Sequence, residues 1–322
     1  MARRARITGL TAAVGATLLA GALTAGTPAS AAPAPAAAAA STYRTVSGTA
    51  KCQPGGADCF TALTDLNGNP ARLGGSAPVV VQTGHLPSFG SGLPMSQLTG
   101  TGGDIAGTGG QQGYHWRVFD QNGQVPAAGS EVFFHASAPF TDAGRAAREA
   151  VVFTDAAGNA RVNFTGTLAA TPVAVIATGR SPYTGPGLPV NLVTSGYSRT
   201  GFTVRALNQA GHPIASRGIR IHYWATNQAA TPNTRAGQTT VTPDAKGQAS
   251  IPWTIFAKGL SALSVVLTGT SPVTGPSMPV NLLATVLQSD RVVVRVFDQT
   301  GRPVTSPVRI AYYATKTTAS VS

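Results

Sequence analysis

Apolar and polar residues alternate one by one along many short stretches of the chain. Between positions 202 and 206, for example, Phe202, Val204 and Ala206 alternate with Thr203 and Arg205. Successive strand residues point to opposite faces of a sheet, so this period of two predicts strands with one buried face. The apolar members of similar stretches are Tyr114, Trp116 and Val118; Val132, Phe134 and Ala136; Ala160, Val162 and Phe164; Val173, Val175 and Ala177; Ile221, Tyr223 and Ala225; Ala249, Ile251 and Trp253; and Leu263, Val265 and Leu267.

The 38 glycines and 23 prolines of the chain are frequent in the turns between these stretches. Both residues disfavour helix interiors, and the chain after its first 31 residues shows no sustained helical period of apolar positions. Short strands every 8 to 12 residues or so are typical of antiparallel β-sandwiches. We therefore expect an all-β fold.

Two markers recur along the chain and reveal internal repeats. The segment Ser181-Pro-Tyr-Thr-Gly-Pro-Gly-Leu-Pro-Val-Asn-Leu192 returns at 271–282, and a weaker copy occupies 86–95. The segment Arg117-Val-Phe-Asp-Gln-Asn-Gly123 returns at 205–211 and again at 295–301. A fixed period of this kind is the signature of a repeated folding module, here about 90 residues long.

The order of these markers predicts two complete repeats flanked by two complementary partial ones. The complete repeats are expected at 111–194 and 195–285, each as one antiparallel sandwich. The partial repeats are expected at 43–110, which includes a glycine-rich connector, and at 286–322. A few strands alone expose an apolar face and open edges, which favours pairing with another segment.

Our hypothesis is that the tail completes the front segment. It could do so within one chain, closing three modules into a compact ring, or between chains by self-association. The alternatives are a truncated gene product, or two divergent caps that are each stable.

A family resemblance follows from the segments 118–126, Val132-Phe-Phe134 and 154–160. They resemble the bacterial immunoglobulin-like domain of group 1, the invasin and intimin type. That pattern is a strand ending in Asp-x-x-Gly-x-Pro, a Val-x-Phe strand, and then Thr-Asp-x-x-Gly-x-Ala. The copy at 202–269 departs from it, with Asn208 in place of the first aspartate and Pro243 before Asp244. The resemblance implies tandem immunoglobulin-like sandwiches in a stalk, spacer or adhesive protein without an active site.

The N-terminus indicates export. Residues 1–31 combine a basic start, an apolar stretch and a small-residue cleavage site, which is typical of a secretory signal peptide. The Ala/Pro tract within 32–42 is expected to be a disordered leader, and we expect no membrane span. In an oxidising exterior, Cys52 and Cys59 are expected to form a disulfide; two free thiols are the alternative.

The chain is basic, with 23 lysines and arginines against 11 acidic residues. The basic residues are scattered, but Arg117, Arg205 and Arg295 occupy matched positions of the repeat and are expected to face outward. They form either an ordinary solvated face or a sparse stripe for anionic polymers. We expect no nucleic-acid partner.

The residue types needed for catalysis are present but lack catalytic spacing. Aspartates in Asp-x-x-Gly segments are expected to cap turns, with glycine in the left-handed conformation. These aspartates are Asp65, Asp120, Asp155, Asp244 and Asp298. The five histidines show no metal-binding spacing, so we predict no metal, no cofactor and no enzymatic activity.

One group of residues has binding potential. His135, Trp224 and Tyr313 occupy matched positions on the face opposite Phe134 and its counterparts. If exposed, such rings stack on sugars, while neighbouring arginines pair with anionic groups; the alternative is burial between modules. The leading hypothesis is therefore a secreted structural or adhesive protein at the bacterial cell exterior. The alternative function is a module that binds carbohydrate or cell-wall polymer.

Overall fold

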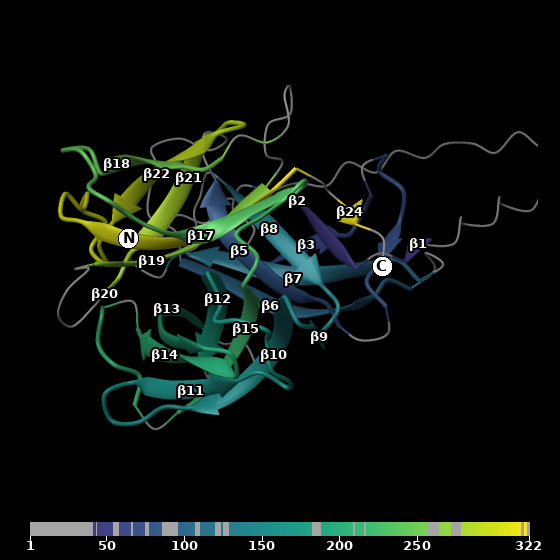
Figure 1. Ribbon diagram of the computed structural model, residues 1–322, viewed down its shortest axis with the longest axis horizontal. Helices are drawn as coiled ribbons and strands as arrows, with labels where there is room; N and C mark the ends of the chain where they lie inside the picture. Colours follow the sequence, from purple (N-terminus) through teal and green to yellow (C-terminus); the bar gives the residue numbers. More distant parts are fainter. Residues whose placement is uncertain are drawn as a thin grey trace, which may run out of the picture. The chain divides into compact units, whose positions relative to one another are not determined.

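The computed structural model shows an all-β chain (Figure 1). It describes residues 41–320 apart from 43, 54–57, 66, 75–76, 86–95, 107–109, 120–123, 125–128, 182–187, 209, 216, 255, 257–263, 272–277 and 317–318. Every regular element in these residues is a strand, which confirms that the fold is all-β. The expected signal peptide and all but the last residues of the leader lie outside the described residues.

The first sandwich joins the front of the chain to the strands that follow the glycine-rich segment. One sheet contains the order β2-β8-β5 and the other the order β3-β7-β6, and these neighbours are antiparallel. The end of β5 also pairs in parallel with β21 (Asn281–Leu287), so the first of these sheets continues into the third sandwich. Tyr114, Trp116 and Phe134 are among the buried side chains that fill the space between them. The strands are β2 (Thr45–Cys52), β3 (Cys59–Ala62), β5 (Val79–His85), β6 (Ser96–Asp104), β7 (Gln112–Phe119) and β8 (Ser130–Ser137).

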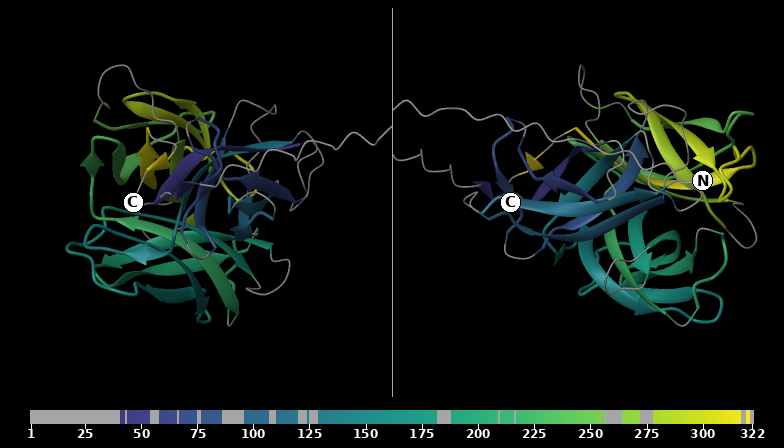
Figure 2. Two further views of the ribbon diagram at one scale, coloured as in Figure 1. Left: turned by 90° about the vertical axis from the view of Figure 1, so that its right-hand side faces the viewer. Right: turned by 180° about the vertical axis from the view of Figure 1, so that it is seen from behind.

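The second sandwich, the teal-to-green group of strands in Figures 1 and 2, repeats this arrangement. Its neighbours run β10-β15-β12 and β11-β14-β13, around a core that contains Phe202 and Tyr223. Here the pairing of β12 with β13 joins the two sets into one continuous sheet. The strands are β10 (Arg145–Phe153), β11 (Asn159–Asn163), β12 (Ala174–Ser181), β13 (Leu188–Ser198), β14 (Gly201–Leu207) and β15 (Gly218–Thr226).

The third sandwich has the same strand order again, β17-β23-β19 and β18-β22-β21. Trp253, Phe256 and Val294 lie in its core. The strands are β17 (Thr234–Val241), β18 (Gln248–Pro252), β19 (Ser264–Ser271), β21 (Asn281–Leu287), β22 (Arg291–Phe297) and β23 (Val308–Thr315). Short strands extend the sheets or pair separately: β1 (Ser41–Thr42), β4 (Ala71–Arg72), β9 (Phe140–Thr141), β16 (Ala230–Thr231), β20 (Met278–Pro279) and β24 (Ala319–Ser320).

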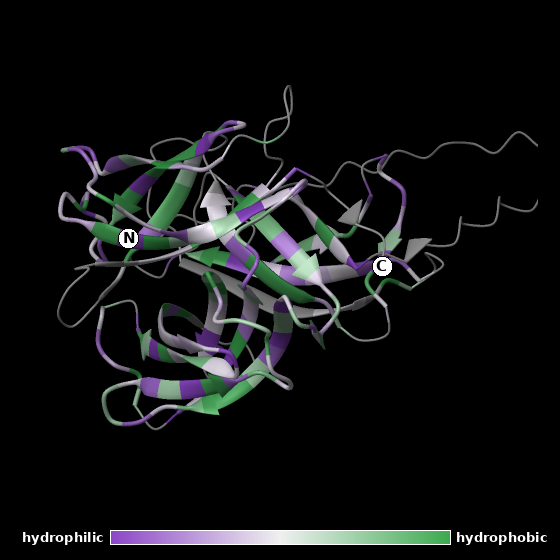
Figure 3. Cartoon of the chain, viewed as in Figure 1, coloured by the Kyte–Doolittle hydropathy of each residue, from purple (hydrophilic) through white to green (hydrophobic). Residues whose placement is uncertain are grey.

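Alternation within the strands supplies the three cores. Along β14, residues Phe202, Val204 and Ala206 are fully buried, whereas Thr203 and Arg205 are half-buried. Figure 3 shows the same alternation as bands of opposite hydropathy along strands. Burying a large apolar side chain of this kind stabilises a fold by about 1.5–3 kcal/mol.

The strand sets begin and end about half a repeat away from the units expected from the sequence. The front segment shares its core with β7 and β8, which lie within the expected repeat 111–194. The tail strands β22 and β23 complete the third core instead of the front segment. The tail also pairs with the front segment through β24, in which Ala319 pairs with Val46, and its Tyr313 packs in one buried cluster with Val79 and Val81.

The disulfide between Cys52 and Cys59 is confirmed. It joins the end of β2 to the start of β3, with the two Cα atoms 5.5 Å apart, and so links the two sheets of the first sandwich. Closing a loop of this size restricts the unfolded chain and stabilises the fold by about 2–3 kcal/mol.

The Asp-x-x-Gly turns have the predicted structure. Asp155 Oδ1 accepts hydrogen bonds from the amides of Ala157 and Asn159, and the backbone of Gly158 has a φ of 80°. The same pair of side-chain bonds is made by Asp65, Asp244 and Asp298 and by Asn208. These carboxylates therefore shape turns, as expected; Asp120 lies outside the described residues.

Candidate functional site

His135, Trp224 and Tyr313 meet at the junction of the three sandwiches. The ring centroid of His135 lies 4.3 Å from that of Trp224 and 4.7 Å from that of Tyr313, and the latter two are 5.2 Å apart. They come from the middle strands β8, β15 and β23, each at the same register within its sheet. Apolar side chains from all three sandwiches surround Trp224 and Tyr313: Val79, Val81, Ala147, Ala174, Ile176, Ala236, Val266 and Ala311.

Burial decides between the two interpretations of this aromatic group. The exposed fractions are 2% for His135, 1% for Trp224 and 5% for Tyr313. A ring covered on both faces cannot stack on a sugar in solution, so these residues do not form an exposed binding face. They form the junction instead, and aromatic pairs of this geometry add about 0.5–1.5 kcal/mol beyond the area that they bury.

His135 is neutral in this environment. Burial, and secondarily the positive charge of Arg145, lowers its pKa to about 3. Its Nδ1 lies 2.5 Å from the Ser47 hydroxyl, within the first sandwich. At neutral pH the imidazole therefore packs as an aromatic ring, and it is not poised for proton transfer.

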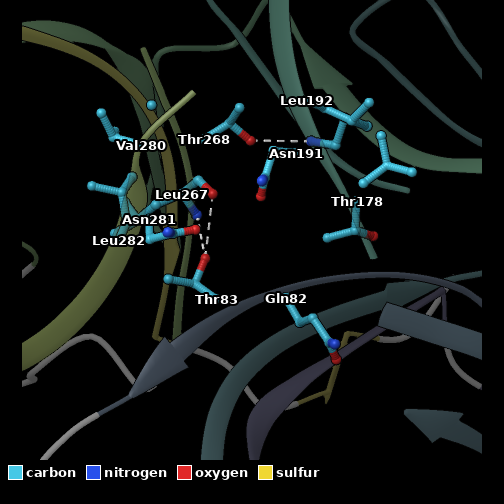
Figure 4. Close-up of a pocket in the computed structure, with 13 residues that line it drawn as sticks. Gln82, Thr83, Thr178, Asn191, Leu192, Leu267, Thr268, Val280, Asn281 and Leu282 are labelled. Atoms are coloured by element: carbon cyan, nitrogen blue, oxygen red, sulfur yellow. Dashed lines mark hydrogen bonds between the residues drawn. The ribbon is translucent and has the colours of Figure 1, made fainter. Parts of the chain in front are cut away.

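Three threonines at matched positions tie the strands β5, β12 and β19 together (Figure 4). Thr83 Oγ1 accepts a hydrogen bond from the Leu267 amide at 2.7 Å. Thr268 Oγ1 accepts one from the Ala177 amide at 3.2 Å, and the Thr178 hydroxyl donates to the Val80 carbonyl at 3.3 Å. Each sandwich thus contributes one threonine to a neighbour, and the three bonds close a cycle.

A cavity of about 80 Å3 lies beside these threonines. Its polar lining consists of amides and hydroxyls, including Gln82, Asn191 and Asn281, and contains no charged residue. Gln82 is only 3% exposed (Figure 4). A space of this size and chemistry suits a few water molecules rather than a substrate.

A histidine also binds the backbone of β5 at the junction. The Val80 amide of β5 donates to His222 Nδ1 at 3.1 Å, across two sandwiches. His222 Nε2 lies 3.0 Å from a Glu149 carboxylate oxygen, which also pairs with Arg220. Because Nδ1 accepts, the network assigns the proton to Nε2, from which it is donated to Glu149. The bond with His222, despite partial burial, lowers the pKa of Glu149 below its ordinary value.

The three matched arginines are each used locally. Arg117 lies 3.7 Å from Asp58, and Arg205 Nε donates to the Ala157 carbonyl at 3.3 Å. Arg295 lies over the Phe297 ring, 4.8 Å from its centroid. They occupy matched middle strands, β7, β14 and β22, of three different sandwiches.

Two groups of residues, one around Phe60 and one around Arg145, were not singled out from the sequence. Phe60 is 47% exposed, its ring centroid is 5.0 Å from that of His115, and Asp58 lies 3.7 Å from both His115 and Arg117. Neither alternation nor a motif indicates this surface, because Phe60 occupies an outward position on β3. The second group surrounds Arg145.

Among the described residues, no cluster of three or more histidine, cysteine, aspartate or glutamate side chains has the geometry to hold a metal ion. The same part of the chain has no helix with the length and apolar character required to cross a membrane. Comparison with known proteins found no matching family model, no similar curated protein and no similar solved structure.

Proposed function

We propose that the chain is a secreted, non-enzymatic protein whose tandem immunoglobulin-like sandwiches have a structural or adhesive role at the bacterial cell exterior. The observation that carries the proposal is the buried junction of His135, Trp224 and Tyr313. Three sandwiches that share a packed centre hold their outer loops and edges in fixed positions, which suits a load-bearing or presenting element. The disulfide between Cys52 and Cys59 is compatible with an oxidising exterior.

Expression of the full chain in a bacterium tests export and location. We expect a product that begins at residue 32, found in the medium or released from the wall by salt. Deletion of the gene should reduce attachment of the cells to surfaces or weaken the envelope. A product that keeps residues 1–31 and stays in the cytoplasm would contradict the proposal.

A second candidate function is the binding of carbohydrate or cell-wall polymer, now at a different surface. Phe60 supplies an exposed ring, and His115, Arg117 and Asp58 supply polar groups beside it. An aromatic face flanked by charged hydrogen-bonding groups is the kind of surface that recognises sugars.

Pull-down on purified cell walls and on insoluble polysaccharides separates the two candidates. The second candidate is favoured if binding saturates, if free sugars compete for it, and if Phe60→Ala and Arg117→Gln each abolish it. Phe153 is the matched control, because it is 69% exposed but lies on β10 of another sandwich. The structural role is favoured if binding does not saturate, or if Phe153→Ala loses as much binding as Phe60→Ala.

A further inference from the structure

Arg145 is the one charged residue that lines a second cavity of about 120 Å3. The cavity lies between the second and third sandwiches, beside β2 of the first. Besides Arg145 and Tyr313, its lining consists of hydroxyl and amide side chains, among them Thr45, Thr226, Gln228 and Asn233. It contains no carboxylate. Its volume is several times the 10–15 Å3 or so that one water molecule needs.

The charges around the cavity are unbalanced. Asp142 pairs with Arg145 at 3.1 Å and with Arg44 at 2.8 Å, so one carboxylate serves two guanidinium groups. Burial opposes ionisation of Asp142, but the amide of Gly144 and the charge of Arg145 keep its pKa below the ordinary value. The cluster therefore carries one net positive charge.

Arg145 also has unused bonding capacity. Its Nε is buried and has no hydrogen-bond partner within the described residues. Leaving a buried donor unsatisfied is costly, and the cost is greater for a charged group. The guanidinium carbon lies over the Phe140 ring, 5.6 Å from its centroid, within the range of a cation–π contact. A guanidinium group has five N–H donors, and one of its nitrogens, Nη2, already donates to Asp142. Oxyanions accept strong hydrogen bonds from such charged donors.

We propose that this cavity binds a small oxyanion, with Arg145 as its charged ligand and the surrounding hydroxyl and amide groups as neutral donors. Phosphate and sulfate have the acceptor geometry that the arginine fork requires. The site does not depend on the role proposed above, because an ion could bind here in a structural, an adhesive or a polysaccharide-binding protein.

Calorimetric titration of the full mature chain with sodium phosphate tests the proposal, with sodium chloride at equal ionic strength as the reference. We expect saturable phosphate binding in the millimolar range or tighter, and at least tenfold weaker binding in Arg145→Gln. Arg145→Lys, which keeps the charge but loses the fork, should fall between them. Thr226→Val, which keeps the shape but loses a hydroxyl, should weaken binding less than Arg145→Gln.

Arg44→Gln is the matched control. It removes one of the two guanidinium groups that pair with Asp142, but Arg44 does not line the cavity. If Arg44→Gln weakens binding as much as Arg145→Gln, or if phosphate binds no better than chloride, the proposal is wrong. A parallel titration with glycerol 1-phosphate shows the source of the ligand. Equal or tighter binding identifies the phosphate end of a larger molecule, and weaker binding identifies the free ion.

Discussion

The imidazole of His135 lies edge-on to the indole of Trp224, with an interplanar angle of 75°. The two residues belong to different sandwiches, and Tyr313 of the third completes the group. A junction built from one buried ring per sandwich couples the stabilities of the three, because loosening one exposes aromatic surface of the other two. The chain is therefore expected to unfold as one cooperative unit.

The first prediction concerns pH. The pKa of His135 is about 3 in the folded chain and about 6.5 when unfolded, so between these values the unfolded chain binds a proton that the folded chain does not. The stabilisation is complete above pH 6.5 and is lost as the pH falls toward 3. At 1.36 kcal/mol per pH unit, the loss between pH 7 and 4.5 is about 2–3 kcal/mol. Urea unfolding at the two pH values measures it.

The double variant Ser47→Ala/His135→Phe should remove most of this difference. Phenylalanine keeps a ring at a position where the other sandwiches have Trp224 and Tyr313, and alanine avoids leaving the Ser47 hydroxyl unpaired. His212→Ala is the control, because this side chain is exposed. An unchanged loss of stability in the double variant would show that His135 does not cause it.

The second prediction concerns the bond between His222 and the backbone of β5. His222→Phe should destabilise the fold by about 1–3 kcal/mol, because it leaves the buried Val80 amide without an acceptor. Phenylalanine is tolerated at the matched position of the first sandwich, where Phe133 stands at the same register. Hydrogen exchange of the Val80 amide should accelerate in this variant and stay slow in His212→Ala. Exchange that is unaffected by His222→Phe would contradict the bond.

The third prediction compares two glycines that share a φ of 80°. An alanine Cβ at position 158 would lie 2.6 Å from the Ala206 carbonyl oxygen and 3.2 Å from Pro213. A Cβ at Gly68 would meet nothing within 4 Å. Gly68→Ala should therefore cost only the backbone strain, about 1 kcal/mol, and Gly158→Ala about 1–2 kcal/mol more. Thermal and urea unfolding measure both; equal costs would mean that the turn does not pack closely on β14.

Local patterns could be predicted well from the sequence. The alternation from Phe202 to Ala206 identified β14, and the Asp-x-x-Gly pattern identified turns whose bonds are set within five residues. The disulfide followed from two cysteines close in sequence in a chain that we expect to be exported. In each case the physical cause lies within a few residues of the pattern.

The grouping of strands into sandwiches could not be predicted in the same way. A repeat establishes the length of the module, but it does not show at which residue each module begins. The pairing of β7 with β3 and β6, as opposed to strands further along, depends on packing of Tyr114 and Trp116 against the front segment. Burial of His135, Trp224 and Tyr313 between modules was one of the two interpretations of the sequence, and the structure shows them buried. The Val80 to His222 bond could not be predicted, because it joins residues with no shared motif.

The fourth prediction tests the role of the tail. Deleting 290–322 removes β22 and β23, and with them Val292, Val294 and Ile310 from the third core. We expect protease cleavage throughout 230–289, together with partial loosening of the junction through loss of Tyr313. Limited proteolysis with mass spectrometry locates the cuts. Deleting only 317–322 is the control, since it removes β24 and leaves all three cores intact. If the long deletion instead makes 45–85 sensitive while 230–289 stays protected, the tail completes the front segment, and the strand grouping described above is incorrect.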